Sequence, residues 1–124
     1  MIARSVHHVS FAVADLDRSR RFYEEALGLR QIPRPDFGIA GVWYAVGGSQ
    51  LHLIATPAGV DVGRPVAKLS PLANHCAFEV DDYAKTLAHM RGRGLEVMEM
   101  TPPASQMWIR DPDGNVIELV APQS

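Results

Sequence analysis

The sequence predicts an α+β fold built from two related βαβββ modules. One reason is an internal repeat, because the stretch from His8 to Asp15 returns from His75 to Asp82 at an offset of 67 residues. The stretch from Gly48 to Ile54 likewise returns from Gly114 to Val120 at an offset of 66 residues. A second reason is that strand and helix patterns follow one another in the same order in both halves. A duplicated unit explains both observations.

The first half begins with a strand over residues 6–13, where Val and Phe alternate with smaller or polar residues. Asp15 or Asp17 can cap a helix that runs to about Leu27, and Gly28 stands where a left-handed C-terminal cap belongs. Further strands are expected at 29–34, 40–46 and 50–55.

The second half repeats this order after a Pro- and Gly-rich stretch. We expect a strand at 74–80, a helix from about 82 to 92 ending at Gly92 and Gly94, and strands at 95–100, 106–110 and 115–121. The run Asp111-Pro112-Asp113-Gly114 predicts a tight turn between the last two strands. Residues 1–124 are thus interpreted as a single domain, with module one at about 1–56, a surface linker at about 57–71 and module two at about 72–124.

Composition limits the functional classes. The chain has 124 residues and a net charge of −2, with a pI near 6.2, which gives no reason to expect nucleic acid or an anionic membrane as partner. No apolar run reaches the length of a membrane span, and the N-terminus lacks the pattern of a secretory signal. The lone Cys76 suits a reducing compartment, so a cytoplasmic protein is predicted.

Four candidate metal ligands fall at equivalent repeat positions, His8 with His75 and His52 with Glu118. Because side chains alternate along a strand, all four are expected on the face away from the helices. If the mixed sheets curl, that face encloses a concave metal-binding cavity. Imidazole and carboxylate suit one divalent ion per site, namely Zn, Ni, Co, Mn or Fe(II), and the subset His8, His75 and Glu118 matches a two-histidine-one-carboxylate facial triad.

Other side chains have simpler interpretations. His7 is expected on the helix side, His89 on the second helix, and Cys76 as a small apolar core residue. Glu79 shares the face of His75 and either touches substrate or faces solvent. Arg110 either orients an anionic substrate or pairs with a neighbouring aspartate. The remaining candidates are either pocket walls or core residues: Trp43, Tyr44, Met107 and Trp108.

The chain resembles the vicinal oxygen chelate superfamily in three strings, HHVSFAVADLDRSRRFYEEALGL, NHCAFEVDD and RDPDGNVIELV. That superfamily includes glyoxalase I, fosfomycin-resistance enzymes, methylmalonyl-CoA epimerase, extradiol dioxygenases and bleomycin-binding proteins. The resemblance implies metal ligands at His8, His75 and Glu118. His52 matches a position that holds Glu in bacterial glyoxalase I and Gln in the epimerase. The resemblance also implies a homodimer whose sites are each built from modules of two chains.

By this resemblance the chain is a glyoxalase-like metal-dependent lyase or isomerase. The small oxygen-rich substrate would be chelated through vicinal oxygens, with Lewis-acid stabilisation of an enediolate and Glu118 as the catalytic residue that moves the proton. Bacterial glyoxalase I carries an Arg for the glutathione carboxylate four residues after the first ligand, where this chain has Ala12. The alternative is a metal-free small-molecule (antibiotic) binding or resistance protein. An Fe(II) dioxygenase is disfavoured, because such enzymes usually need a longer chain.

Overall fold

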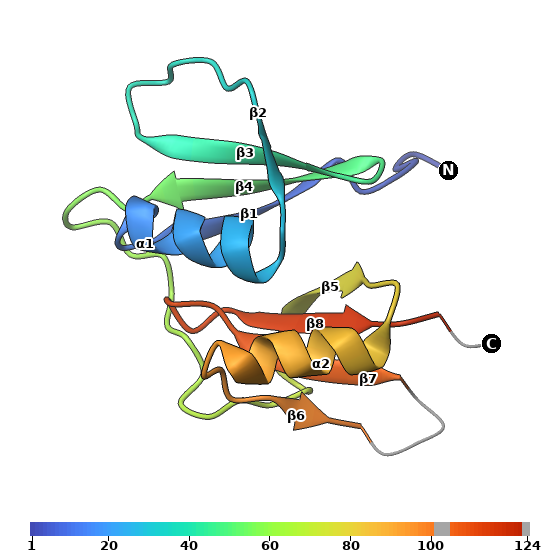
Figure 1. Cartoon of the computed structure of the whole chain (residues 1–124). Coiled ribbons are helices and arrows are strands. Elements are labelled where there is room, and N and C mark those ends of the chain that lie inside the picture. The colour runs from blue at the N-terminus through green and yellow to red at the C-terminus, as the bar shows by residue number, and fades with distance from the viewer. Residues whose placement is uncertain (101–104, 123–124) are drawn as a thin grey trace. The chain divides into compact units, whose positions relative to one another are not determined.

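Each half of the chain forms one four-stranded mixed sheet with a helical element (Figure 1). The computed structural model describes residues 1–100 and 105–122. The chain divides into two compact units, Met1–Gly63 and Arg64–Ser124. The predicted α+β class is therefore confirmed, with two open sheets that are not closed into a barrel.

The first unit contains strand β1 (His8–Val13), helix α1 (Leu16–Arg21) with a π-helical continuation (Phe22–Ala26), and strands β2 (Arg30–Ile32), β3 (Gly41–Val46) and β4 (Ser49–Ala55). Their order in the sheet is β1-β4-β3-β2. Strand β1 runs parallel to β4, while β3 is antiparallel to both β4 and β2. The first and last strands of the unit thus lie side by side.

The second unit repeats this topology with strand β5 (His75–Glu79), helix α2 (Tyr83–Gly92) and strands β6 (Met98–Glu99), β7 (Gln106–Arg110) and β8 (Val116–Val120). The sheet order is β5-β8-β7-β6, with β5 parallel to β8. The sequence repeat is therefore a repeat of strand pairing, so equivalent residues occupy equivalent places in the two sheets.

The helix starts are fixed by aspartates. Asp15 accepts a hydrogen bond from the backbone N–H of Arg18 at 3.1 Å, and Asp82 accepts one from Lys85 at 2.9 Å. These bonds satisfy backbone donors that have no partner within the helix. Gly28, with φ of 69°, adopts the predicted left-handed conformation after the helical segment.

Two strands are shorter than predicted. Strand β2 spans three residues and β6 spans two, where six were expected for each. Both are edge strands that pair with a single neighbour. Pro33 follows β2 directly and has no N–H to donate, which ends the ladder there. Only Met100 separates the end of β6 from residues 101–104, which lie outside the described part of the chain.

In both units the core lies between sheet and helix. In the first unit it contains Val13, Phe22, Tyr23, Ala26, Val42, Tyr44, Leu51 and Leu53. In the second unit it contains Phe78, Met90, Met107, Ile109, Ile117 and Leu119. Within the predicted surface linker, Leu69 is buried and packs with Trp108 and Val116, so part of that stretch covers the other face of the second sheet.

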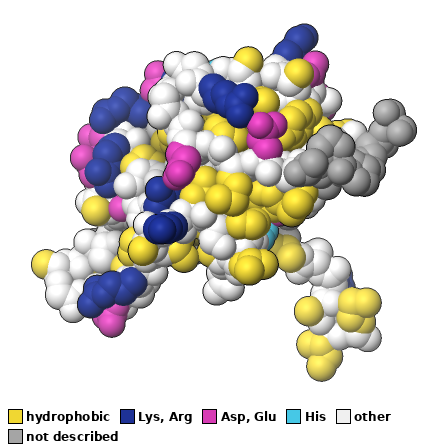
Figure 2. Space-filling model, turned by 90° about the horizontal axis from the view of Figure 1, so that it is seen from below, with side chains coloured by type: hydrophobic (Ala, Val, Ile, Leu, Met, Phe, Trp, Pro, Cys, Tyr) yellow, Lys and Arg dark blue, Asp and Glu magenta, His cyan; other side chains and the backbone are white. Residues whose placement is uncertain are grey.

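The surface carries no long run of one charge on the face drawn in Figure 2, where basic and acidic side chains are interspersed with hydrophobic ones. Among the described residues, no helix is long and apolar enough to span a membrane.

Candidate metal centre

The first candidate pair, His8 and His52, lies on one face of the first sheet. In the parallel pairing of β1 with β4, His8 is opposite Gln50, so His52 is two positions further along the neighbouring strand. The two imidazole rings stack with centroids 4.0 Å apart and planes inclined by 15°. The predicted proximity of these two residues is therefore present within the first unit.

Trp43 lies on the other side of His52. It is the direct cross-strand partner of His52 between β3 and β4, and the two rings stack at 4.3 Å with planes inclined by 9°. His52 is thus held between an imidazole and an indole, and only 6% of its surface is exposed. Burial, followed by the positive charges of His8, His7 and Arg34, lowers the pKa of His52. Its neutral form, the form that can bind a metal, is therefore favoured.

Hydrogen bonds orient both rings of this pair. His52 Nε2 lies 2.8 Å from Gln50 Oε1, and His8 Nδ1 lies 2.9 Å from His7 Nδ1. The expectation that His7 belongs to the helix side missed this contact. The sequence offered one signal for it, since His7 is adjacent to His8 in the loop before β1, where strict alternation of side chains does not yet apply.

The stacked rings cannot both bind one ion as they stand. The lone pair of an imidazole nitrogen lies in the ring plane, and a bound metal sits about 2.0–2.1 Å from the nitrogen in that plane. Planes inclined by 15° with centroids 4.0 Å apart do not meet near either nitrogen. One ring must therefore turn, and leave the stack, before His8 and His52 can share a metal.

The second candidate pair, His75 and Glu118, has the same diagonal register. His75 is opposite Val116, and Glu118 lies two positions further along β8. His75 Nε2 is 2.9 Å from Glu118 Oε1, and the two side chains are 24% and 10% exposed. In place of a ring stack, this unit has a direct contact between an imidazole and a nearly buried carboxylate.

Further hydrogen bonds hold both members of this pair. His75 Nδ1 donates to the backbone oxygen of Ala73 at 2.7 Å, and Gln106 Nε2 donates to Glu118 Oε2 at 2.9 Å. Because the Ala73 carbonyl can only accept, Nδ1 carries a proton and Nε2 faces the carboxylate. Nε2 and Glu118 Oε1 thus face each other, in positions from which both could bind one cation.

Trp108 occupies in the second unit the place that Trp43 has in the first. It is the cross-strand partner of Glu118, and its ring meets that of His75 edge-on at 6.4 Å and 90°. Trp108 is 3% exposed, and its Nε1 has no hydrogen-bond partner among the described residues. Tyr44 and Met107, the other two candidate wall residues, are fully buried on the helix side instead.

The remaining candidates have structural partners or face solvent. Arg110 pairs with Glu96 at 3.0 Å, a partner that neither interpretation of this residue named. His89 and Glu79 are exposed, and for Glu79 this agrees with the solvent-facing alternative. Cys76 is half-buried, and burial raises the pKa of its thiol.

The four predicted ligands are therefore arranged as two pairs, one in each unit. Within residues 1–100 and 105–122, no group of three or more His, Cys, Asp or Glu side chains is close enough to hold a metal ion. The donors themselves fit a divalent metal, because imidazole nitrogens and a carboxylate oxygen suit such ions. Hydrogen bonds that hold the remaining polar atoms, here one to a backbone carbonyl and one from a glutamine, are also the usual support for metal-binding side chains.

This duplicated fold, with paired imidazole and carboxylate donors on equivalent strands, defines a known class. Residues 5–119 match the family model of the Glyoxalase/Bleomycin resistance protein/Dioxygenase superfamily. The chain belongs to that superfamily, which confirms the resemblance stated above.

Curated relatives are similar over most of the chain. It is 28% identical over 121 residues to Glyoxylase I 4 of Arabidopsis thaliana, covering 93% of this chain and 69% of that protein. It is also 28% identical over 127 residues to the lactoylglutathione lyase of Haemophilus influenzae, covering 94% and 92% of the two chains.

Solved structures share the fold. A Bacillus anthracis structure described as of the glyoxalase family superposes with a TM-score of 0.81 at 22% identity, covering 99% of this chain and 98% of that one. An antibiotic binding protein from Streptomyces sp. CB03234 superposes with a TM-score of 0.70 at 25% identity, covering 99% of each chain.

Proposed function

We propose that this chain is a glyoxalase-like lyase or isomerase that uses a divalent metal to act on a small substrate with vicinal oxygens. The observation that carries the proposal is the His75–Glu118 pair, whose ligating atoms are 2.9 Å apart and whose other polar atoms are held by Ala73 and Gln106. Lactoylglutathione lyases among the relatives support the reaction class.

In this proposal His8, His52, His75 and Glu118 hold the metal, as Zn, Ni, Co, Mn or Fe(II). The ion would supply Lewis-acid chemistry, polarising the substrate oxygens that it binds. His75 presents Nε2 because its Nδ1 is committed to the Ala73 carbonyl. His52 contributes only after it leaves the stack with His8 and Trp43, so His8, His75 and Glu118 form the minimal ligand set.

Glu118 is also the proposed catalytic residue. Its Oε1 lies 2.9 Å from His75 Nε2, and its Oε2 accepts a hydrogen bond from Gln106. A carboxylate in this position can accept a proton from one substrate carbon and return it to the neighbouring carbon. The Gln106 bond keeps the carboxylate from turning during that transfer.

We also propose that each site is completed by a second copy of the chain. Subunit complementation tests this directly. His8→Ala and Glu118→Ala proteins, each unable to bind metal, are mixed, unfolded and refolded together. If one site takes its ligands from two chains, the mixed dimer contains one intact site and regains metal. If a site takes them from one chain, no metal returns.

The function itself is tested by metal analysis and turnover. Protein purified without added metal or a nickel affinity step should contain about one divalent ion per chain. His8→Ala and Glu118→Ala should each lose the ion and lose turnover of 2-oxoaldehyde adducts. A chain that stays metal-free after reconstitution with Zn, Ni, Mn and Fe(II) would rule out the metal-dependent enzyme.

The second candidate is a metal-free protein that holds an antibiotic. It is favoured by the similarity, at 25% identity, to the antibiotic binding protein from Streptomyces. Glu118→Ala separates the two functions, because it should abolish turnover in a metal enzyme and leave ligand affinity nearly unchanged in a binding protein.

A further inference from the structure

Arg34 stands out in the first unit because part of its charge is buried without a partner. It lies in the segment between β2 and β3, flanked by Pro33 and Pro35, whose rings restrict the backbone on both sides. Its Nε is shielded from solvent and has no hydrogen-bond partner among the described residues. A buried donor on a charged group is costly to leave unbonded, so an anion close to the guanidinium would offset part of that cost.

Neighbouring groups hold the guanidinium in place without using that N–H. Its central carbon lies 5.0 Å from the centre of the Phe37 ring, a cation–π contact. A Cβ on Gly41 would fall 2.9 Å from both Cζ and Nε of Arg34, so the guanidinium lies over Gly41 where another residue would displace it. Asp36, nearby in sequence, uses Oδ1 to accept from the backbone N–H of Gly38 at 2.8 Å.

Aromatic contacts connect this arginine with the first candidate pair. The rings of Phe37 and Trp43 are 6.0 Å apart, and Trp43 stacks on His52 at 4.3 Å. The charge of Arg34 is one of those that act on His52. The guanidinium is therefore on the side of the sheet that carries His8 and His52, within electrostatic reach of them.

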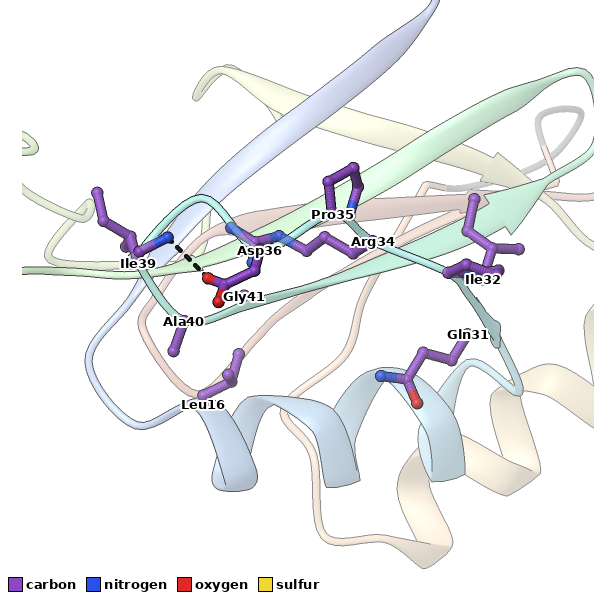
Figure 3. Close-up of a pocket in the computed structure, with 11 residues that line it drawn as sticks. Leu16, Gln31, Ile32, Arg34, Pro35, Asp36, Ile39, Ala40 and Gly41 are labelled. Atoms are coloured by element: carbon purple, nitrogen blue, oxygen red, sulfur yellow. Dashed lines mark hydrogen bonds between the residues drawn. The ribbon is translucent and has the colours of Figure 1, made fainter.

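The arginine also lines a pocket (Figure 3). The pocket has a volume of about 780 Å³ and is formed by Leu16 and by residues 31–36 and 38–41. That volume is in the range of small-molecule sites. Its lining is mixed, with the apolar side chains of Ile32, Pro33, Pro35 and Ile39 beside the polar groups of Arg34 and Asp36. A mixed pocket that contains a cation suits a small molecule that ends in an anionic group.

We propose that Arg34 and this pocket bind an oxyanion group of the substrate. A guanidinium can present its two Nη groups as a planar fork, which matches a carboxylate or a phosphoryl group. The carboxylate of Asp36 in the same lining disfavours a dianion, so a singly charged carboxylate is preferred. The substrate assignment rests on the proposed function, whereas anion binding by Arg34 does not.

The test follows the Nε–H resonance of Arg34 by ¹H–¹⁵N NMR in the metal-free full-length chain. Lactate serves as the carboxylate probe, lactamide as its neutral analogue and inorganic phosphate as the phosphoryl probe. We expect lactate to shift the resonance saturably and more tightly than phosphate, and lactamide to leave it unchanged. A tighter response to phosphate would keep the anion site and assign it to phosphoryl substrates. No response to either anion would overturn the proposal.

Variants assign the response to the arginine. Arg34→Met should weaken lactate binding by about tenfold or more, as expected for the loss of a charge-assisted fork. Arg34→Lys, which keeps the charge, tests the same point if the Met variant fails to fold, and should bind lactate more weakly than the wild type. Arg30→Met is the matched control, since Arg30 is exposed on β2, and should bind normally. Equal binding by wild type, Arg34→Met and Arg34→Lys would refute the site.

The two proposals can fail separately. Metal affinity is measured independently by competition with a chromophoric chelator. Lactate binding that depends on Arg34, in a chain that takes up no metal, would support the anion site and refute the metal-dependent enzyme. Normal metal uptake without anion binding would support the metal site and refute the anion site.

Discussion

Replacing Gln106 by leucine tests the second candidate pair without touching a proposed ligand. Gln106 Nε2 donates at 2.9 Å to Glu118 Oε2, while the other carboxylate oxygen meets His75. The substitution therefore removes the donor that fixes the plane of the carboxylate. A hydrogen bond to a charged group contributes about 1.5–3 kcal/mol. Since about 1.4 kcal/mol corresponds to a factor of ten, metal affinity should fall by roughly 10- to 100-fold.

The assay is a competition titration of Zn or Ni against a chromophoric chelator, performed on metal-free protein. Thermal unfolding of the same samples shows whether the variant remains folded at the temperature of the titration. Gln31→Leu is the control, because Gln31 is an exposed glutamine on the edge strand β2 of the other unit. It should leave the metal dissociation constant unchanged.

The reasoning would be refuted if folded Gln106→Leu bound metal as tightly as the wild type while Glu118→Ala did not bind. That result would mean that the Glu118 carboxylate is oriented by the metal alone, and that the hydrogen bond from Gln106 plays no part in preparing the site.

Four further predictions use other features of the structure. Metal binding through both His8 and His52 should change Trp43 fluorescence, because the ring stacked at 4.3 Å must move, and Trp43→Phe should remove that change. Gly41→Ala should destabilise the fold by about 1–3 kcal/mol in denaturant titrations, since its Cβ would lie 2.6 Å from a backbone oxygen, whereas Gly48→Ala, with open space, should not. Asp111→Ala should lower the thermal midpoint, because the buried carboxylate accepts from two backbone N–H groups in the β7–β8 turn. Because burial raises its pKa, the Cys76 thiol should stay protonated at pH 8 and react with a disulfide reagent more slowly in the native than in the unfolded chain.

The repeat made the fold predictable. Strand alternation and the offset between His8 and His75 predicted that each strand of the first half has an equivalent strand in the second half. The parallel pairing of β1 with β4 has the same register as that of β5 with β8. The edge strands were overestimated, because apolar alternation at 29–34 and 95–100 says nothing about how many neighbours a strand has. Pairing on one side only, with a proline next to β2, limits their length.

The orientation and the hydrogen-bond partners of the candidate ligands could not be predicted from the sequence. The alternation rule gives the face on which His52 and Glu118 lie but no ring orientation. Ring orientation depends on cross-strand neighbours, here Trp43 and Gln50 for His52. Gln106 was missed for the same reason, since it lies on β7 and reaches Glu118 on β8 diagonally across the sheet.

The two pairs also differ in what their chemistry allows before any metal arrives. At equivalent register positions one unit has imidazole next to imidazole and the other has imidazole next to carboxylate. Two imidazoles beside an indole gain most by stacking, so His8, His52 and Trp43 form a column whose nitrogens do not converge. The imidazole of His75 and the carboxylate of Glu118 form a hydrogen bond, so His75 Nε2 and Glu118 Oε1 already converge. Within the described units, the second pair is therefore pre-organised for a cation, and the first must reorganise. His52, which stands at the repeat position equivalent to Glu118, creates this asymmetry.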